Sequence, residues 1–217
     1  MSDTGVSPPT VIINGTRGAG KSTLVTNLCT RFQPHVGGVI SQSVGTADRP
    51  DSVRAGIDVV LIPETERIAL AVVVDPNRVD PNRPAPTYPL VRGDLSRLSG
   101  ERTSDYGPFR FSCDAIDIVN RHLSSIADGM KSAVDLVVID EIGPIELERG
   151  GGFLPGALSV LASTLPTVIS VRTSLAREIT ELANAAGRRV DLIALEGDTR
   201  EETMDSVVAI LKRRGVV

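Results

Sequence analysis

The stretch that decides the fold is TVIINGTRGAGKSTLVTNLCTRF, residues 10–32. Its first part, Thr10–Asn14, is apolar and rich in β-branched residues, which is typical of a buried strand. A glycine-rich turn follows. The segment Lys21–Phe32 then repeats apolar residues at helical spacing, namely Leu24, Val25, Leu28, Cys29 and Phe32. These residues predict a strand, a tight loop and an amphipathic helix in succession.

The loop of this unit matches the pattern GxxxxGK(S/T). Its glycines allow backbone N–H groups to converge on phosphate oxygens, and the amino end of a helix favours negative charge. In this pattern Lys21 reaches the β- and γ-phosphates, and the hydroxyl of Ser22 binds magnesium. The alternative is an ordinary glycine-rich turn, which the flanking strand and helix disfavour. We therefore expect these residues to bind nucleotide: Gly15, Thr16, Arg17, Gly18, Ala19, Gly20, Lys21, Ser22 and Thr23.

Two acidic residues end a second apolar segment, LVVIDE at residues 136–141. Acidic side chains are rarely buried unless they are paired or bind a metal, so Asp140 at the end of a strand is informative. We expect Asp140 to be a magnesium ligand and Glu141 to polarise the attacking water, with Lys21 as the second catalytic group. Because side chains alternate along a strand, the two carboxylates are expected to point in opposite directions. The alternative is a pair of solvated acids in a loop.

The rest of the chain alternates short apolar runs with amphipathic segments, which predicts α/β architecture with a mostly parallel sheet flanked by helices. An antiparallel hairpin is expected from Gly56–Ile62 and Ile68–Val74. We interpret residues 1–217 as a single domain with a loop-rich insertion at about 75–107, which we take as a mobile segment rather than a lid over the nucleotide. The other expected strands are Gly38–Val44, Thr167–Arg172 and Val190–Leu195, and the other expected helices are Asp114–Ala127, Phe153–Leu165, Leu175–Ala186 and a last helix that opens with a capping box of Thr199 and Glu202.

The composition is ordinary for a globular protein, with 217 residues of which 41% are hydrophobic and 23% charged. The formal net charge of −4 argues against tight, sequence-independent binding of nucleic acid. No apolar run approaches the ~20 residues that cross a bilayer, and the first residues lack a secretory signal, so we expect a cytoplasmic protein that does not bind membranes. Two cysteines, Cys29 and Cys113, fit no metal-ligand spacing.

The acidic pair opens the sequence DEIGPIEL, Asp140–Leu147, which resembles the DEIGPMEL signature of the THEP-type, or cancer-related, nucleoside-triphosphatase family. Similar features occur in the same order elsewhere, namely VGGVISQSV at 36–44, RAGIDVV at 54–60 and IALA at 68–71. The resemblance extends from about Val11 to Leu211, although only the two nucleotide motifs are specific. It implies a RecA-like P-loop NTPase fold and magnesium-dependent hydrolysis of ATP, GTP and other nucleoside triphosphates.

The chain departs from this family pattern at three places. Arg17 replaces the usual proline of the loop, the segment before the middle helix reads PFRF at Pro108–Phe111, and a late Asn-Arg pair appears as Thr199-Arg200. These departures leave triphosphate binding intact, but they leave base preference and turnover open.

Four further residues are candidates for weaker roles. Arg17 could touch a phosphate or face solvent, and Arg172, at the end of a strand, could sense the γ-phosphate. Arg200 could approach the base or a phosphate, or simply begin a helix, and Glu146 has no chemical role beyond orienting the adjoining turn. No residue stands out as an arginine finger, which can accelerate phosphoryl transfer by roughly 10³–10⁵, so we expect slow intrinsic turnover.

Three functions are consistent with these motifs. The favoured one is hydrolysis of a nucleoside triphosphate to the diphosphate and phosphate, because two acids adjoin the phosphate loop. The second is a P-loop small-molecule or nucleotide kinase, in which Arg92, Arg97, Arg102 and Arg110 would cover the phosphates. The third is a nucleotide-dependent adaptor that recruits a protein partner, whose identity no motif indicates.

Overall fold

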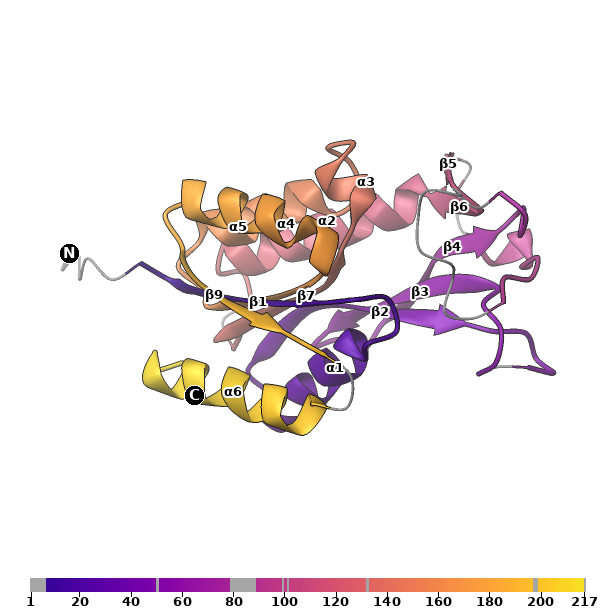
Figure 1. Ribbon diagram of the computed structural model, residues 1–217. Helices are drawn as coiled ribbons and strands as arrows, with labels where there is room; N and C mark the ends of the chain where they lie inside the picture. The colour runs from indigo at the N-terminus through magenta and orange to yellow at the C-terminus, as the bar shows by residue number, and fades with distance from the viewer. Residues whose placement is uncertain are drawn as a thin grey trace.

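The computed structural model describes residues 7–49, 51–78, 89–98, 100, 102–131, 133–196 and 199–216. Its strands form one sheet in the order β5-β6-β4-β3-β2-β7-β8-β1-β9 (Figure 1). The strands are β1 Pro9–Gly15, β2 Val36–Val44, β3 Gly56–Ile62, β4 Arg67–Val73, β5 Thr103–Tyr106, β6 Phe109–Ser112, β7 Leu136–Ile142, β8 Thr167–Arg172 and β9 Arg189–Ala194. The helices are α1 Lys21–Phe32, α2 Cys113–Ala127, α3 Pro144–Leu147, α4 Leu154–Ala162, α5 Ala176–Ala185 and α6 Arg200–Arg213, with short 3₁₀ turns at Leu95–Arg97 and Thr173–Leu175.

The sheet has a parallel half and an antiparallel half. Strands β2, β7, β8, β1 and β9 pair in parallel, while β3, β4, β6 and β5 extend the β2 edge by antiparallel pairing. The α/β architecture, a sheet whose core is mostly parallel and the added antiparallel hairpin are therefore confirmed. The carboxyl ends of the parallel strands lie at one edge of the sheet, where open α/β sheets bind their ligands.

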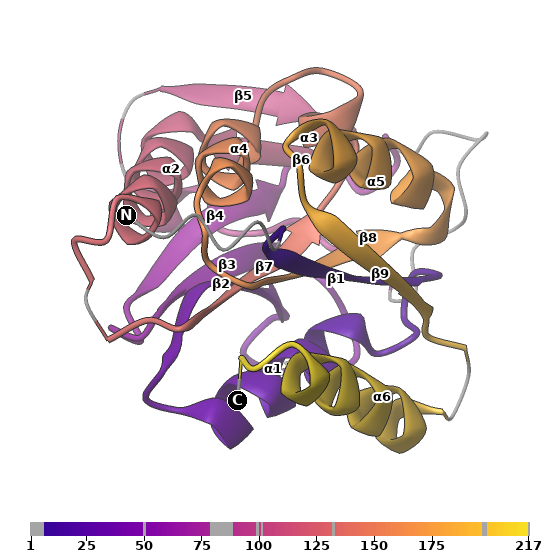
Figure 2. The ribbon, with the colours of Figure 1, turned by 90° about the vertical axis from the view of Figure 1, so that its left-hand side faces the viewer.

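Helices cover both faces of the sheet. Figures 1 and 2 show α2, α3, α4 and α5 on one face and α1 and α6 on the other. Strand β1 illustrates why both faces are covered: Ile12 packs into the core on the first face, whereas Val11 and Ile13 pack into the core on the second. Each of these side chains is fully buried, and each contributes about 1.5–3 kcal/mol of hydrophobic stabilisation. Among the described helices, none combines the length and apolar character that crossing a bilayer requires.

The range 75–107, which we interpret as a loop-rich insertion, contains one strand that the sequence analysis did not predict. Strand β5 lies within this range and pairs with β6, and the Asp105 carboxylate accepts a hydrogen bond of 2.7 Å from Arg110 Nε across the pair. Both strands have only four residues, so they carry little periodicity, and their cross-strand pairing stabilises them instead. Within this range, residues 79–88, 99 and 101 lie outside the described residues.

The predicted capping box at the start of α6 is also wrong. Thr199 occupies the N-cap position, but its side chain accepts no hydrogen bond from the first turn of the helix. Its hydroxyl instead donates to the backbone oxygen of Glu196 at 2.7 Å. This local bond competes with capping, as hydroxyl groups near helix ends often do.

A buried arginine joins the strands at the opposite edge of the sheet, where β1 and β8 begin. Arg188 is 4% exposed, and burial lowers the pKa of its guanidinium to about 10, so the group stays charged at neutral pH. Its acceptors are neutral oxygens: Thr10 Oγ1, Thr167 Oγ1 and the backbone oxygens of Pro9, Ser163 and Leu165. A buried charge is tolerated when its donors are satisfied in this way.

Candidate functional site

The glycine-rich loop joins β1 to α1 at the carboxyl edge of the sheet. Gly18 and Gly20 have φ angles of 81° and 93°, a region that favours glycine. A Cβ atom on Gly15 would lie 2.9 Å from the backbone oxygen of Leu195, so the neighbouring chain also requires a glycine there. At Gly20 a Cβ atom would lie 2.8 Å from Cδ of Arg200. Arg200 therefore packs against the loop, in addition to beginning α6.

Lys21 is the first residue of α1, and its side chain folds back over the loop. Its Nζ donates to the backbone oxygens of Gly15 and Thr16, each at 3.0 Å, and the residue is 4% exposed. Burial lowers the pKa of the ammonium group, while the carboxylates of Glu141 and Asp140 oppose that shift. The cation therefore lies in a water-poor place with two carboxylates close by.

Asp140 lies near the end of β7 and is completely buried. Burial raises the pKa of its carboxyl group to about 6, and hydrogen bonds from the hydroxyls of Ser170 and Ser22 act in the opposite direction. The backbone N–H of Ser41 also donates to Asp140 Oδ2, at 3.3 Å. The influence of Ser22 on this pKa shows that the end of the glycine-rich loop lies near the end of β7.

Glu141 does not point away from Asp140, so the expected alternation is wrong at this place. The pairing of β7 with β8 shifts register between Ile139 and Ile142, and Ile142 rather than Glu141 continues the side of the strand that Ile139 occupies. Both carboxylates consequently act on Lys21. Arg172 Nε, at the end of β8, donates to Glu141 Oε1 at 3.0 Å and holds its side chain.

The turn that follows β7 is held by a buried acid. The two carboxylate oxygens of Glu146 accept hydrogen bonds from the backbone N–H groups of Gly143, at 2.8 Å, and Phe153, at 3.0 Å. Burial raises the pKa of Glu146, and these two bonds counteract that shift. Asn120 of α2 holds the same turn by donating to the backbone oxygen of Gly152 at 3.0 Å. The structure thus gives Glu146 the positioning role that the sequence analysis expected.

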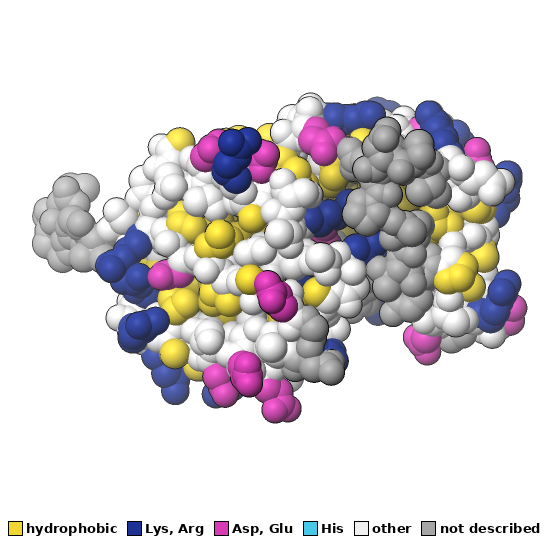
Figure 3. All heavy atoms as spheres, viewed as in Figure 1, with side chains coloured by type: hydrophobic (Ala, Val, Ile, Leu, Met, Phe, Trp, Pro, Cys, Tyr) yellow, Lys and Arg dark blue, Asp and Glu magenta, His cyan; other side chains and the backbone are white. Residues whose placement is uncertain are grey.

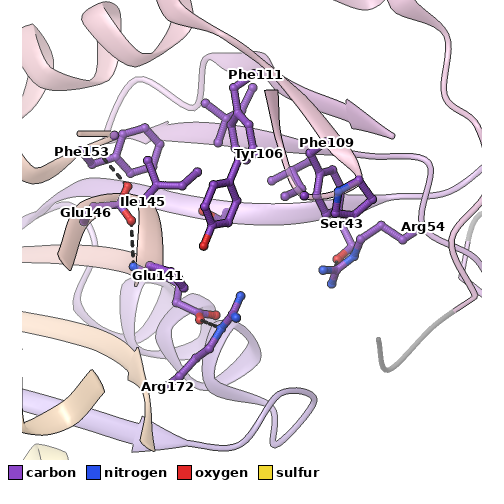
Figure 4. Close-up of a pocket in the computed structure, with 18 of the residues that line it drawn as sticks. Ser43, Arg54, Tyr106, Phe109, Phe111, Glu141, Ile145, Glu146, Phe153 and Arg172 are labelled. Carbon is purple, nitrogen blue, oxygen red and sulfur yellow. Dashed lines mark hydrogen bonds and ion pairs between the residues drawn. The ribbon is translucent and has the colours of Figure 1, made fainter. Parts of the chain in front are cut away.

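A cavity of about 360 Å³ adjoins these groups. At one end it is lined by Arg17, Ser22, Glu141 and Arg172. From there it extends between β5, β6 and the turn after β7, where Figure 4 shows aromatic rings and Ile145 around the opening. Viewed from outside, the coloured atoms of Figure 3 show basic side chains recessed in a hollow near the middle of this face.

The structure brings together most of the residues that the sequence singled out. Lys21, Ser22, Asp140, Glu141 and Arg172 meet at the carboxyl edge of the sheet. Arg17 lines the cavity, whereas the neighbouring Thr23 is exposed on α1.

The arginine cover that motivated the kinase hypothesis is not observed. Arg97 donates to Asp58 at 2.7 Å, Arg110 binds Asp105, and Arg102 binds Asp114 and Asp117. These arginines are held by carboxylates, and Arg92 is exposed without lining the cavity.

The sequence analysis missed other residues around the cavity, among them Arg54, Tyr106 and Arg149. They come from separate segments, and no local motif connects them. Phe109 and Phe111 also line the cavity, and their only signal was that PFRF departs from the family pattern.

Comparison with known proteins identifies the fold. No protein-family model matches the chain, and no curated protein matches it either. Two solved structures do match. A human cancer-related nucleoside triphosphatase has a TM-score of 0.61 and 19% identity, and the match covers 94% of this chain and 98% of that one. THEP1 from the hyperthermophile Aquifex aeolicus has a TM-score of 0.60 and 16% identity, and the match covers 93% of this chain and 98% of that one. The resemblance to THEP-type proteins is thereby confirmed at the level of the fold, which this chain shares with these two structures.

Proposed function

We propose that this chain, which has the P-loop NTPase fold, hydrolyses nucleoside triphosphates to the diphosphate and phosphate with magnesium as its cofactor. The observation that carries the proposal is the convergence of Lys21, Ser22, Asp140 and Glu141 at one edge of the sheet. One structural relative is described as a nucleoside triphosphatase and the other as THEP1. The first description supports the same class of activity here.

The triphosphate is expected to lie along the glycine-rich loop. Backbone N–H groups of the loop and the amino end of α1 favour the anion, and Lys21 needs only to exchange its two backbone acceptors for phosphate oxygens. The site is already partly desolvated, which strengthens each of these charge interactions. Binding therefore replaces weak acceptors of the ammonium group by charged ones.

Magnesium fits the oxygen atoms that Ser22 and Asp140 present. The Ser22 hydroxyl lowers the pKa of the Asp140 carboxyl, so the two groups lie near each other, and hard oxygen ligands suit this ion. Among the described residues there is no cluster of three or more metal-ligating side chains, which agrees with an ion held mainly by substrate phosphates and water. When bound, the ion would neutralise charge on the β- and γ-phosphates.

In this proposal Glu141 acts on the attacking water. The water oxygen forms a bond to the γ-phosphorus, the bond from that phosphorus to the β,γ-bridging oxygen breaks, and Glu141 accepts the proton of the water. Arg172 holds the Glu141 carboxylate through its Nε, so its position is fixed before the substrate arrives. A general base of this kind contributes roughly 10²–10⁴-fold to the rate.

Phosphate release with ATP, GTP, CTP and UTP, with magnesium or with excess EDTA, tests the proposal. We expect Glu141→Gln to keep nucleotide affinity and to lower kcat by about 10²–10⁴-fold. Glu148→Gln is the matched control, because Glu148 is an exposed acid of the following helix end and does not line the cavity. Equal turnover of wild type and Glu141→Gln would contradict the role of Glu141. Absence of magnesium-dependent phosphate release with all four nucleotides would refute the proposed hydrolysis.

The cavity beside Glu141 favours a second candidate function, a small-molecule kinase. Its volume of about 360 Å³ lies in the range of organic-ligand pockets and greatly exceeds the space that one water requires. In this reaction the hydroxyl oxygen of an acceptor replaces water as the attacking atom and its proton passes to Glu141. Chromatography of reactions with γ-labelled ATP and panels of alcohols, nucleosides and phosphomonoesters distinguishes the two, since a kinase forms labelled organic product faster than free phosphate.

A further inference from the structure

The cavity continues from the phosphate end into a wall of rings and aliphatic side chains. We call this part the aromatic chamber and define it by Tyr106, Phe109, Phe111, Ile145 and Phe153 (Figure 4). The first three residues come from β5 and β6, and the last two from the turn that Glu146 holds. Hydrolysis alone requires no apolar wall beside the attacking water, so the aromatic chamber calls for another occupant.

The aromatic chamber lies on the γ-phosphate side of the nucleotide site. Lys21, Ser22 and Glu141 mark the γ-phosphate end of a triphosphate bound along the loop. The cavity begins at Ser22 and Glu141 and extends away from the loop. The nucleoside is attached at the α-phosphate, the opposite end of the chain of phosphates, so the nucleobase does not fill this space.

The charged groups around the cavity favour an anion. Among the described residues its lining contains four arginines, Arg17, Arg54, Arg149 and Arg172, against two acids, Glu141 and Glu146. Both acids already accept hydrogen bonds, Glu141 from Arg172 and Glu146 from two backbone N–H groups.

Two of these arginines border the aromatic chamber itself. The guanidinium carbon of Arg149 lies 4.5 Å from the centroid of the Tyr106 ring, and Arg54 donates to Ser43 Oγ at 2.5 Å at the opposite side of the opening. Figure 4 shows the Arg54 side chain extending toward the same space as Tyr106. An aromatic surface bordered by guanidinium groups suits a ring that carries a negative charge.

We propose that the aromatic chamber is a second small-molecule site, which takes a planar apolar compound with an anionic group and places it where the attacking water would otherwise lie beside Glu141. That the aromatic chamber binds such a compound is inferred from the cavity alone. That the compound takes the place of the attacking water rests on the proposed hydrolysis. Such a compound therefore regulates or replaces water attack without occupying the phosphate loop.

The probe for this site is 8-anilinonaphthalene-1-sulfonate, whose fused rings and sulfonate have the required chemistry and whose fluorescence rises in an apolar site. We expect saturable binding of one probe to the folded protein without nucleotide. Bound probe should lower the rate of phosphate release at saturating ATP and leave the KM for ATP unchanged, because it excludes water and not the triphosphate.

Three variants locate the bound probe. Ile57→Trp adds bulk to a half-buried residue that lines the cavity, and should weaken probe binding by more than about tenfold, since overfilling a pocket costs at least ~1.4 kcal/mol. Arg149→Gln, at an exposed position, should weaken it by about fivefold through loss of the charge. The matched control Arg121→Gln removes an exposed arginine of α2 that does not line the cavity, and should leave probe affinity unchanged.

Several outcomes would overturn the inference. Probe binding that Ile57→Trp and Arg149→Gln leave intact would place the probe elsewhere, with thermal melting confirming that both variants fold. Competition between probe and ATP would assign the aromatic chamber to the nucleotide. Absence of phosphate release in wild type, together with probe binding that the variants weaken as stated, would refute the proposed hydrolysis and retain the site.

Discussion

Two buried cations at opposite ends of β1 have equal exposure and different surroundings. Lys21 and Arg188 are each 4% exposed, and each donates to backbone oxygens at its end of the strand. The described hydrogen-bond acceptors of Arg188 are all neutral oxygens, and they tie β1 to β8. Lys21 lies close to the carboxylates Asp140 and Glu141 and donates hydrogen bonds to the glycine-rich loop. The comparison indicates that Arg188 holds the fold, and the carboxylates beside Lys21 agree with the ligand-binding role that we propose for it.

The largest effect that this comparison predicts is the loss of catalysis in Lys21→Met. Removal of the ammonium group should lower kcat/KM for nucleoside triphosphates by about 10³-fold, as loss of a central charge donor does. The free energy of unfolding should fall by less than in the corresponding Arg188 variant, because Lys21 has only two described hydrogen-bond acceptors, the backbone oxygens of Gly15 and Thr16. Steady-state kinetics and urea unfolding measure the two quantities. A marked loss of stability would break the distinction from Arg188.

The second prediction concerns Arg188→Met. Several buried oxygens that now accept hydrogen bonds would lose their donor, and we expect the free energy of unfolding to fall by about 4 kcal/mol. Chemical unfolding measures this change, and titration with labelled nucleotide below the unfolding transition should show unaltered affinity. Arg189→Met serves as the control, because Arg189 is exposed and adjacent in sequence.

The third prediction is a pH dependence at the Lys21 end of β1. Burial raises the pKa of Asp140 from 3.8 to about 6, so the folded protein holds this proton more tightly than the unfolded chain. Without magnesium or nucleotide, stability from this group is present below about pH 4 and is lost as the pH rises to about 6, by up to about 3 kcal/mol.

Asp140→Asn isolates the contribution of Asp140 to this dependence. Glu146 and His122 also titrate with shifted pKa values, so the wild-type curve alone does not identify the group. Subtracting the curve of Asp140→Asn removes their effect, and the difference should decline across this pH range. A flat difference would show that the Asp140 carboxylate is as easily ionised in the fold as in the unfolded chain.

The smallest expected effect is that of Arg188→Lys. Lysine keeps the charge but replaces the planar set of five donors by three, so the free energy of unfolding should fall by about 1–2 kcal/mol. A loss as large as that of Arg188→Met would show that geometry, rather than charge, makes Arg188 structural. Thermal and chemical unfolding of both variants under one set of conditions provides the comparison.

The sequence predicted those parts of the fold where the local pattern is strong. Helix α1 and strand β8 begin and end where their apolar spacing indicates, and the two nucleotide motifs meet at one edge of the sheet. The relation of Glu141 to Asp140 was mispredicted, because the register shift in β7 depends on pairing with β8 and leaves no local signal.

The aromatic chamber was outside the reach of sequence analysis for a related reason. Its residues come from β5, β6 and the turn after β7, and only the folded sheet brings them together. Strands β5 and β6 are short and half-buried, and the ion pair of Arg110 with Asp105 that supports them lies across strands. Such pairing energies do not appear in the periodicity of either segment.

The division of the sheet into two halves has a consequence for how such a protein can diverge. The phosphate chemistry that we propose depends on the parallel strands, whereas the antiparallel strands β3, β4, β5 and β6 lie at one margin and supply much of the wall of the neighbouring cavity. Substitutions in that margin can change which compound fits without disturbing the residues that we propose to hold the triphosphate. A descendant of this chain can therefore acquire a new small-molecule ligand through changes at a few edge positions, while the parallel strands stay unchanged.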